Sequence, residues 1–194
     1  MRSFKFNDAV DDIAGSIING NENVFQDIWD RFNLPIRKFI YDMCGNYELT
    51  EELAQETFVR AFKGIKKYRQ ETKFSSWIFG IAKNVVWESS RRLRKAGRNV
   101  EIEEAEFSVF PEEKSSPELL LIEAETLSAV YKALDKIDRE QRLSFVLRVF
   151  HNKSHLEIAE ITGFSVAKIK VDIYRTRKKL RKLLSSFIGK NDEL

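Results

Sequence analysis

Apolar residues recur every three or four positions along most of this chain, which is the spacing of amphipathic helices. In the first half this pattern predicts helices over about residues 23–44, 50–65 and 74–95, with a shorter one at about 8–18. Pro35 predicts a kink or a break in the first of the long segments. Thr50, followed by two glutamates, predicts the N-cap of the second. Phe58, Phe62 and Ile65 are expected to face inward.

The pattern is interrupted once, between residues 97 and 116. This segment combines Gly97, Pro111 and six glutamates, which predicts a flexible acidic linker. Helical spacing resumes after Ser116 and Pro117, a pair typical of a helix start. Since no segment favours a strand, we expect an all-α protein. Its two small helical domains would be residues 1–96 and 117–194, joined by the linker 97–116.

The stretch KSHLEIAEITGFSVAKIKVDIYRTRKKL, residues 153–180, has the pattern of a helix-turn-helix. Ser154 followed by Glu157 predicts a capping box at the first helix. Gly163 can adopt the positive φ of a tight turn, and Ser165 is expected to cap the second helix. By spacing alone, these helices could either read DNA or only pack together.

The second helix has two distinct faces when its residues are placed at about 100° per position. Val166, Ile169 and Ile173 fall on the side expected to be buried. The other side could enter a major groove, and it presents Ala167, Lys168, Lys170, Val171, Tyr174 and Arg175. A basic run that follows would add sequence-independent affinity for phosphates: Lys178, Lys179, Arg181 and Lys182. Asp172 does not fit, because a phosphate would repel it.

Charge and composition narrow the possible functions. The net charge is only +3, but a second basic block stands at residues 91–98, and two such blocks suggest two surfaces for a polyanion. The only cysteine, Cys44, cannot form an internal disulfide and indicates a reducing cytoplasm. We find no signal peptide and no apolar run of the roughly 18 residues that a membrane span needs.

No motif of an enzyme is apparent. The chain has no glycine-rich loop to cradle phosphates, and its two histidines, His151 and His155, lack the partners typical of a metal site. We interpret both as ordinary polar residues on a surface helix or its approach. We therefore expect a protein that is not an enzyme and that needs no cofactor or metal.

Three segments in chain order, ELTEELAQETFVRAFKGIKKYR, KFSSWIFGIAKNVVWESSRRLRK and HLEIAEITGFSVAKIKVDIYRTRKKL, together resemble one known family. It is the sigma-70 family of bacterial transcription initiation factors, in its extracytoplasmic-function (group IV) branch. ELTEELAQETFVRAFKGIKKYR resembles the polymerase-binding helix of the family's second region. KFSSWIFGIAKNVVWESSRRLRK resembles its promoter-melting and minus-ten-reading helix. HLEIAEITGFSVAKIKVDIYRTRKKL resembles its fourth region, which reads the minus-thirty-five element. The resemblance covers about residues 20–185.

The resemblance implies a sigma factor that binds core RNA polymerase, recognises promoter DNA, melts it and starts transcription. The implied polymerase-binding residues are Glu51, Glu52, Leu53, Gln55, Glu56 and Phe58, although Leu53 and Phe58 could equally be core residues. The implied minus-ten residues are Arg69, Gln70, Thr72, Lys73, Lys83, Asn84, Trp87, Arg91, Arg92 and Arg94. Those for minus-thirty-five are Ser165, Lys168, Lys170, Val171, Tyr174, Arg175 and Lys178. Trp77 fits the core better than a stacking role.

Partners and location follow from the same resemblance. Relatives are commonly inhibited by an anti-sigma factor, often membrane-bound, so we expect an anti-sigma factor as a partner here too. The protein itself is expected to be cytoplasmic, held at the membrane only through such a partner and not inserted in it. Val171 and Asp172 depart from many relatives, which carry a small hydroxyl residue and a base there. The alternative is a free-standing dimeric helix-turn-helix regulator, which would bind duplex DNA tightly without polymerase.

Overall fold

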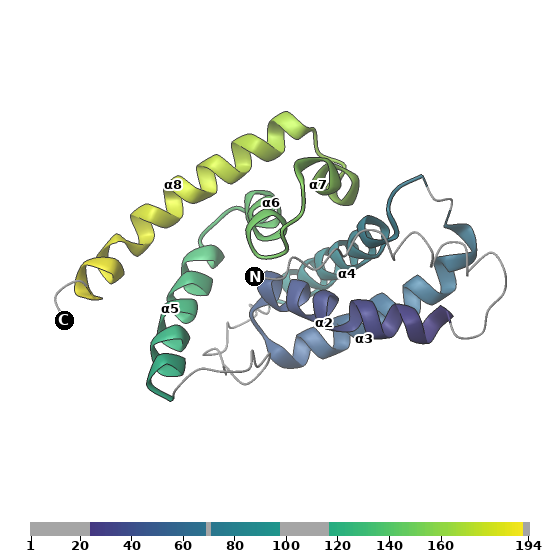
Figure 1. The fold of residues 1–194 in the computed structure, drawn as a ribbon, viewed down its shortest axis with the longest axis horizontal. Coiled ribbons are helices and arrows are strands. Elements are labelled where there is room, and N and C mark those ends of the chain that lie inside the picture. Colours follow the sequence, from purple (N-terminus) through teal and green to yellow (C-terminus); the bar gives the residue numbers. More distant parts are fainter. Residues whose placement is uncertain (1–23, 69–70, 98–116, 192–194) are drawn as a thin grey trace.

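The computed structural model describes residues 24–68, 71–97 and 117–191, and within these ranges every regular element is a helix (Figure 1). The all-α expectation is confirmed. The helix expected at residues 8–18 and the linker at 98–116 lie outside the described residues. The elements are α2 (Val24–Cys44), α3 (Tyr47–Gly64), the 3-10 turn η1 (Ile65–Lys67), α4 (Phe74–Lys95), α5 (Pro117–Asp135), α6 (Arg139–Val149), α7 (His155–Thr162) and α8 (Val166–Asn191).

Helices α2, α3 and α4 pack against one another and bury the apolar stripes that their spacing predicts. Pro35 lies inside α2, yet the helix continues unbroken to Cys44, so the predicted break is absent. A proline removes one helical hydrogen bond, and here the buried Phe32, Ile36 and Phe39 on either side hold the helix together by packing.

Two sequence expectations about α3 are wrong. The helix begins earlier than expected, with Asn46 as its N-cap: the Asn46 side chain accepts from the Leu49 amide at 2.8 Å. Thr50 is instead buried within the helix, and its hydroxyl donates to the Asn46 carbonyl at 2.7 Å. Phe62 does not face inward but is 60% exposed, with its ring edge-on to that of Phe25 at 5.4 Å.

The caps predicted for the two helices of the helix-turn-helix are confirmed. Ser154 and Glu157 form the capping box of α7, and before it Asp138 caps α6. The Ser165 hydroxyl accepts from the Lys168 amide at the start of α8. Gly163 ends α7 in the left-handed region with a φ of 77°. The two helices of the predicted motif therefore meet at a tight turn.

We expect Gly163→Ala to destabilise the protein by roughly 1–2 kcal/mol, because a Cβ disfavours the left-handed conformation. No atom lies within 4 Å of a Cβ built at this position, so the cost comes from backbone strain and not from a clash. Urea denaturation followed by circular dichroism measures the change. An unchanged midpoint and slope would contradict the strain argument.

A single apolar core joins the two halves of the chain. The buried cluster of α2, α3 and α4 also includes apolar residues of α6, α7 and α8: Leu143, Val146, Leu147, Ile158, Ile161, Ile169 and Ile173. In Figure 1, α6 and α7 lie between that first group of helices and α8. A smaller cluster connects α5, α6 and α8: Ala133, Leu134, Ile137, Phe145 and Leu180.

A buried carboxylate on α2 also binds the second half. Asp42 is only 1% exposed, and its Oδ1 accepts from the Tyr131 hydroxyl of α5 at 2.6 Å. Its Oδ2 lies 2.8 Å from His151 Nε2, and its backbone carbonyl accepts from Arg142 at 2.9 Å. Burial, followed by the nearby Asp42 charge, raises the pKa of Tyr131. The interpretation of His151 as a surface residue is wrong, because its side chain lies in this network between the rings of Phe39 and Phe79.

Candidate nucleic-acid interface

The first half of α8 separates into a buried and an exposed face, as predicted for a recognition helix. Ile169 and Ile173 are buried, at 0% and 6% exposure, whereas Val171 and Tyr174 are 44% and 68% exposed. The other predicted contacts Ser165, Lys170, Arg175 and Lys178 are exposed as well. Cations, a flat aromatic ring and an aliphatic side chain therefore share one surface, a combination suited to phosphates and thymine methyl groups.

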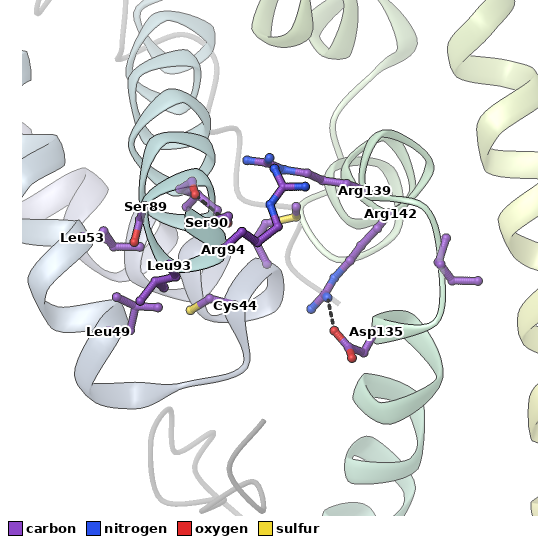
Figure 2. Close-up of a pocket in the computed structure, with 13 residues that line it drawn as sticks. Cys44, Leu49, Leu53, Ser89, Ser90, Leu93, Arg94, Asp135, Arg139 and Arg142 are labelled. Carbon is purple, nitrogen blue, oxygen red and sulfur yellow. Dashed lines mark hydrogen bonds and ion pairs between the residues drawn. The ribbon is translucent and has the colours of Figure 1, made fainter. Parts of the chain in front are cut away.

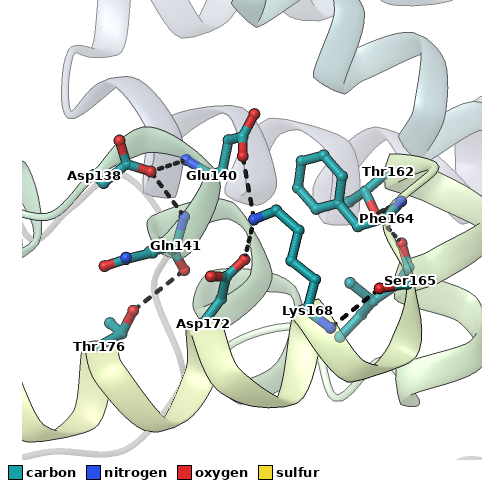
Figure 3. A network of polar contacts seen from close by, with 10 residues as sticks. Asp138, Glu140, Gln141, Thr162, Phe164, Ser165, Lys168, Asp172 and Thr176 are labelled. Atoms are coloured by element: carbon teal, nitrogen blue, oxygen red, sulfur yellow. Dashed lines mark hydrogen bonds and ion pairs between the residues drawn. The ribbon is translucent and has the colours of Figure 1, made fainter.

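Lys168 and Asp172 behave differently from their neighbours on α8 (Figure 3). Asp172 is 4% exposed and accepts from the Lys168 ammonium, which also lies 3.1 Å from Glu140 of α6. Partial burial opposes the charge of Lys168, but the bonds to Asp172 and Glu140 outweigh it and raise the lysine's pKa. The misfit of Asp172 is thereby resolved: its carboxylate faces α6, away from the exposed face, and Lys168 is held beside it.

Figure 3 also shows how the turn of the helix-turn-helix is held. The Thr162 hydroxyl accepts from the Phe164 amide at 3.1 Å and donates to the Ile158 carbonyl. Thr176, buried on α8, donates to the Gln141 carbonyl of α6 at 3.3 Å. These bonds fix the direction in which α8 leaves the turn.

The segment predicted to capture a minus-ten base lies beside the helix-turn-helix. Of its residues, Arg69 and Gln70 are outside the described part of the chain. The Tyr68 hydroxyl donates to the Thr72 carbonyl and so closes the segment. The exposed Lys73 lies 3.9 Å from the Glu157 carboxylate of α7. On α4, Asn84 is exposed and Lys83 is half-buried, and burial lowers the pKa of Lys83.

The two tryptophans of α4 have different surroundings. Trp77 packs on the rings of Tyr68 and Phe74, each at 5.2 Å, which agrees with its interpretation as a core residue. Trp87 is covered from the other half of the chain, since the Arg139 guanidinium lies 4.6 Å from its ring centre. Lys83 lies 5.3 Å from the same ring. In this arrangement Trp87 is engaged by cations of the protein itself.

The carboxyl-terminal end of α4 is strongly basic. Arg91, Arg92 and Arg94 are all exposed there, where cations are also favoured by the helix dipole. Arg94 and Arg91 repel the Arg139 guanidinium of α6. Burial and this repulsion together lower the pKa of Arg139 to about 10.

The predicted polymerase-binding residues on α3 divide into two groups. Glu52 and Gln55 are exposed, Glu51 pairs with Arg37, and Glu56 pairs with Arg60 at 2.7 Å. Leu53 and Phe58 are 1% and 2% exposed and belong to the core. Sequence reasoning missed Val59 and Phe62, two apolar side chains exposed on α3 at 44% and 60%. The sequence could have indicated their exposure, because each stands one residue after a buried position, Phe58 or Ala61, and so lies off the buried stripe of the helix.

Metal binding and membrane insertion find no support in the described residues. None of them form a group of three or more histidine, cysteine or acidic side chains that could hold a metal ion. Within the same part of the chain, no helix is long and apolar enough to cross a bilayer. What the geometry does offer is a helix-turn-helix with an exposed basic face and a second basic surface on α4. These two basic surfaces are the candidates for binding DNA.

Comparison with known proteins identifies the family. Residues 28–98 match sigma-70 region 2, and residues 127–180 match sigma-70 region 4. The chain is 30% identical over 171 residues to the ECF RNA polymerase sigma factor SigW of Bacillus subtilis, covering 85% of this chain and 91% of SigW. It is 31% identical over 150 residues to the ECF sigma factor EcfG of Rhodopseudomonas palustris, covering 77% and 78%.

Solved structures share the fold. The sigma factor RpoE of Bartonella quintana, crystallised with the anti-sigma factor NepR, superposes with a TM-score of 0.68 at 23% identity, over 84% of this chain and 98% of that one. CnrH in complex with the cytosolic domain of CnrY gives 0.69 at 22% identity, over 92% and 99%. The chain therefore belongs to the sigma-70 family of transcription initiation factors, in its extracytoplasmic-function group.

Proposed function

We propose that this sigma factor docks on core RNA polymerase, reads the minus-thirty-five element with α8 and captures the melted minus-ten strand with residues 68–73 and α4. The observation that carries the proposal is the exposed face of α8. Lys170, Val171, Tyr174 and Arg175 point away from a helix whose other side is sealed in the core. Packing of the two helices does not account for an exposed tyrosine surrounded by cations, whereas contact with DNA does.

Polymerase docking is assigned to the exposed polar face of α3. Glu52 and Gln55 are accessible, and Glu51 and Glu56 are partly so. Leu53 and Phe58 act only indirectly, by holding α3 on the core. The exposed Phe62 adds an apolar contact point on the same helix, of the kind that anchors protein interfaces.

The described arrangement belongs to the free protein and must open on the promoter. Lys73 of the minus-ten segment lies 3.9 Å from Glu157 of the helix-turn-helix. The two promoter elements are separated by about 25 base pairs, or about 85 Å of B-form DNA. Both readers cannot engage their elements while they touch each other, so α6, α7 and α8 must leave α2 and α4.

Regulation, location and chemistry follow from the same reading. An anti-sigma factor, as in the RpoE complex, would act by keeping the two halves from the polymerase and the promoter. The site of action is the cytoplasm, where core polymerase and promoter DNA are found. The protein works by binding alone, and melting is driven by the free energy of capturing extruded bases.

The proposal is tested by run-off transcription from genomic fragments with purified core polymerase, with and without this protein. New protein-dependent start sites are expected. Tight binding to duplex operators without polymerase, together with no new start sites, would instead support the dimeric regulator.

On a promoter found in this way, replacing both Lys170 and Arg175 with glutamine should lower transcription at least about tenfold, because each loses a charged contact to DNA. The matched control replaces Lys132, in the last turn of α5, and Lys136, which directly follows that helix; both are exposed and outside the interface, and the change removes the same charge. Equal activity of the two double variants would refute the assignment of the α8 face.

A further inference from the structure

A cavity of about 480 Å³ lies between the two halves, bordered by the end of α4, the α2–α3 junction and the start of α6 (Figure 2). Its volume falls in the range typical of small-molecule sites, about 300–1,000 Å³. The apolar part of its wall is formed by Met43, Leu49, Leu53, Val86, Leu93 and Ile137.

Three arginines from both halves meet at this cavity. Arg94 comes from α4, and Arg139 and Arg142 come from α6. Figure 2 shows the guanidinium groups of Arg94 and Arg139 side by side, whereas Arg142 reaches toward Asp135. Among the described residues that line the cavity, Asp135 is the only acidic one, and its Oδ1 lies 3.5 Å from Arg142.

Two of the three arginines, Arg139 and Arg142, have a buried donor nitrogen with no partner among the described residues. Arg142 is only 6% exposed, and although one of its terminal nitrogens donates to the Asp42 carbonyl, its Nε has no partner among the described residues. Nη2 of Arg139 is likewise buried without a partner there. Buried donors without partners are uncommon, and each one costs free energy.

The charges are also unbalanced. Burial, then the proximity of Arg94 and Arg91, lowers the pKa of Arg139 to about 10. Burial lowers the pKa of Arg142 too, and Asp135 only partly compensates. An anion between Arg94 and Arg139 would remove this repulsion and accept the unused hydrogen bonds, since guanidinium groups match carboxylate and phosphate oxygens in geometry.

We propose that this cavity binds a small anionic amphiphile. Its carboxylate or phosphate head contacts the guanidinium groups of Arg94 and Arg139, and its short apolar tail lies on Leu49, Leu53 and Leu93. Because the head contacts α4 and α6 together, the ligand favours the packed arrangement of the two halves over the open one. The binding site itself rests on this geometry and not on the proposed promoter contacts.

Isothermal titration calorimetry of the full chain tests the site with octanoate and octyl phosphate as probes. At least one should bind saturably at one per chain, with a Kd of about 1 mM or tighter, and the tighter of the two identifies the preferred head group. Failure of both probes would overturn the proposal. So would equal binding of 1-octanol, which lacks the charge, or of inorganic phosphate, which lacks the tail.

Matched variants locate the binding. Arg94→Gln and Arg139→Gln should each lower the affinity for the probe at least tenfold. Arg177→Gln, which changes an exposed arginine of α8, should leave the affinity unchanged. Both rim arginines are incompletely buried, so these variants are expected to fold. Since Arg139 lies over Trp87, binding should also change tryptophan fluorescence in the wild type and not in Trp87→Phe. Unchanged affinity in Arg94→Gln and Arg139→Gln would refute the site.

Discussion

Replacing Asp42 with alanine should destabilise the folded protein by about 3 kcal/mol, a large share of the stability of a typical domain. The carboxylate is 1% exposed and serves Tyr131 and His151 at once. Without it, the half-buried Tyr131 hydroxyl and the buried His151 imidazole both lose their partner. Because both partners come from the second half, the substitution should mainly weaken the packing of the two halves against each other.

Chemical denaturation measures this effect with two probes. In a Trp87→Phe background the remaining tryptophans, Trp29 of α2 and Trp77 of α4, report the first half by fluorescence, whereas circular dichroism reports every helix. The shared core predicts coincident transitions in the wild type, and separated ones in Asp42→Ala. Asp42→Asn keeps an acceptor oxygen and should therefore lose less stability than Asp42→Ala.

Asp30→Ala is the matched control, because Asp30 is exposed on the same helix and only bonds to Gln26. It should change stability by less than about 1 kcal/mol. If Asp42→Ala were no more destabilising than Asp30→Ala, the buried network would not hold the halves together.

Replacing Gly80 with leucine should open the protein, whereas alanine should not. Gly80 lies on α4 where it faces α7, and a Cβ built there would be 3.8 Å from the Ile161 carbonyl, an ordinary contact distance. Alanine therefore fits and should stabilise α4 by roughly 0.5–1 kcal/mol. Leucine adds three more carbon atoms toward the α7 backbone, and the expected cost to the packed arrangement is about 1–3 kcal/mol.

Small-angle scattering distinguishes the two variants, since only leucine should raise the radius of gyration. A shift of 1–3 kcal/mol changes the ratio of open to closed protein by about 5- to 150-fold. If opening precedes promoter binding, the apparent affinity for core polymerase and promoter should rise with the open fraction. A leucine variant as compact as the alanine variant would contradict this view of the interface.

The local structure of the second half could be predicted from its residues. Ser154, Gly163 and Ser165 act through bonds and dihedral angles within a few positions, so their roles follow from neighbours in the sequence. The faces of α8 were predicted for the same reason, because helical periodicity separates Ile169 and Ile173 from Val171 and Tyr174. The N-cap of α3 was misplaced because Asn46 and Thr50 are both acceptable caps, and only packing decides between them.

Long-range partners could not be predicted in this way. Asp172 was interpreted as a misfit because the sequence does not show that it is buried, or that its neighbour Lys168 also pairs with the distant Glu140 of α6. His151 was interpreted as a surface residue because its partner, Asp42, lies 109 positions away. The sequence also does not show that Arg94, Arg139 and Arg142 meet at one cavity, because Arg94 belongs to α4 and the other two belong to α6.

The sequence by itself determined the helices, most of their caps, the family and the exposed face of α8, because these depend on periodicity, local hydrogen bonds and ordered motifs. Only the tertiary structure decided that the two halves share a core, that Asp42 joins them and that an arginine-lined cavity lies between them. The physical reason is that an apolar stripe specifies that it will be buried but not against which partner. That choice is made by shape and charge across distant segments.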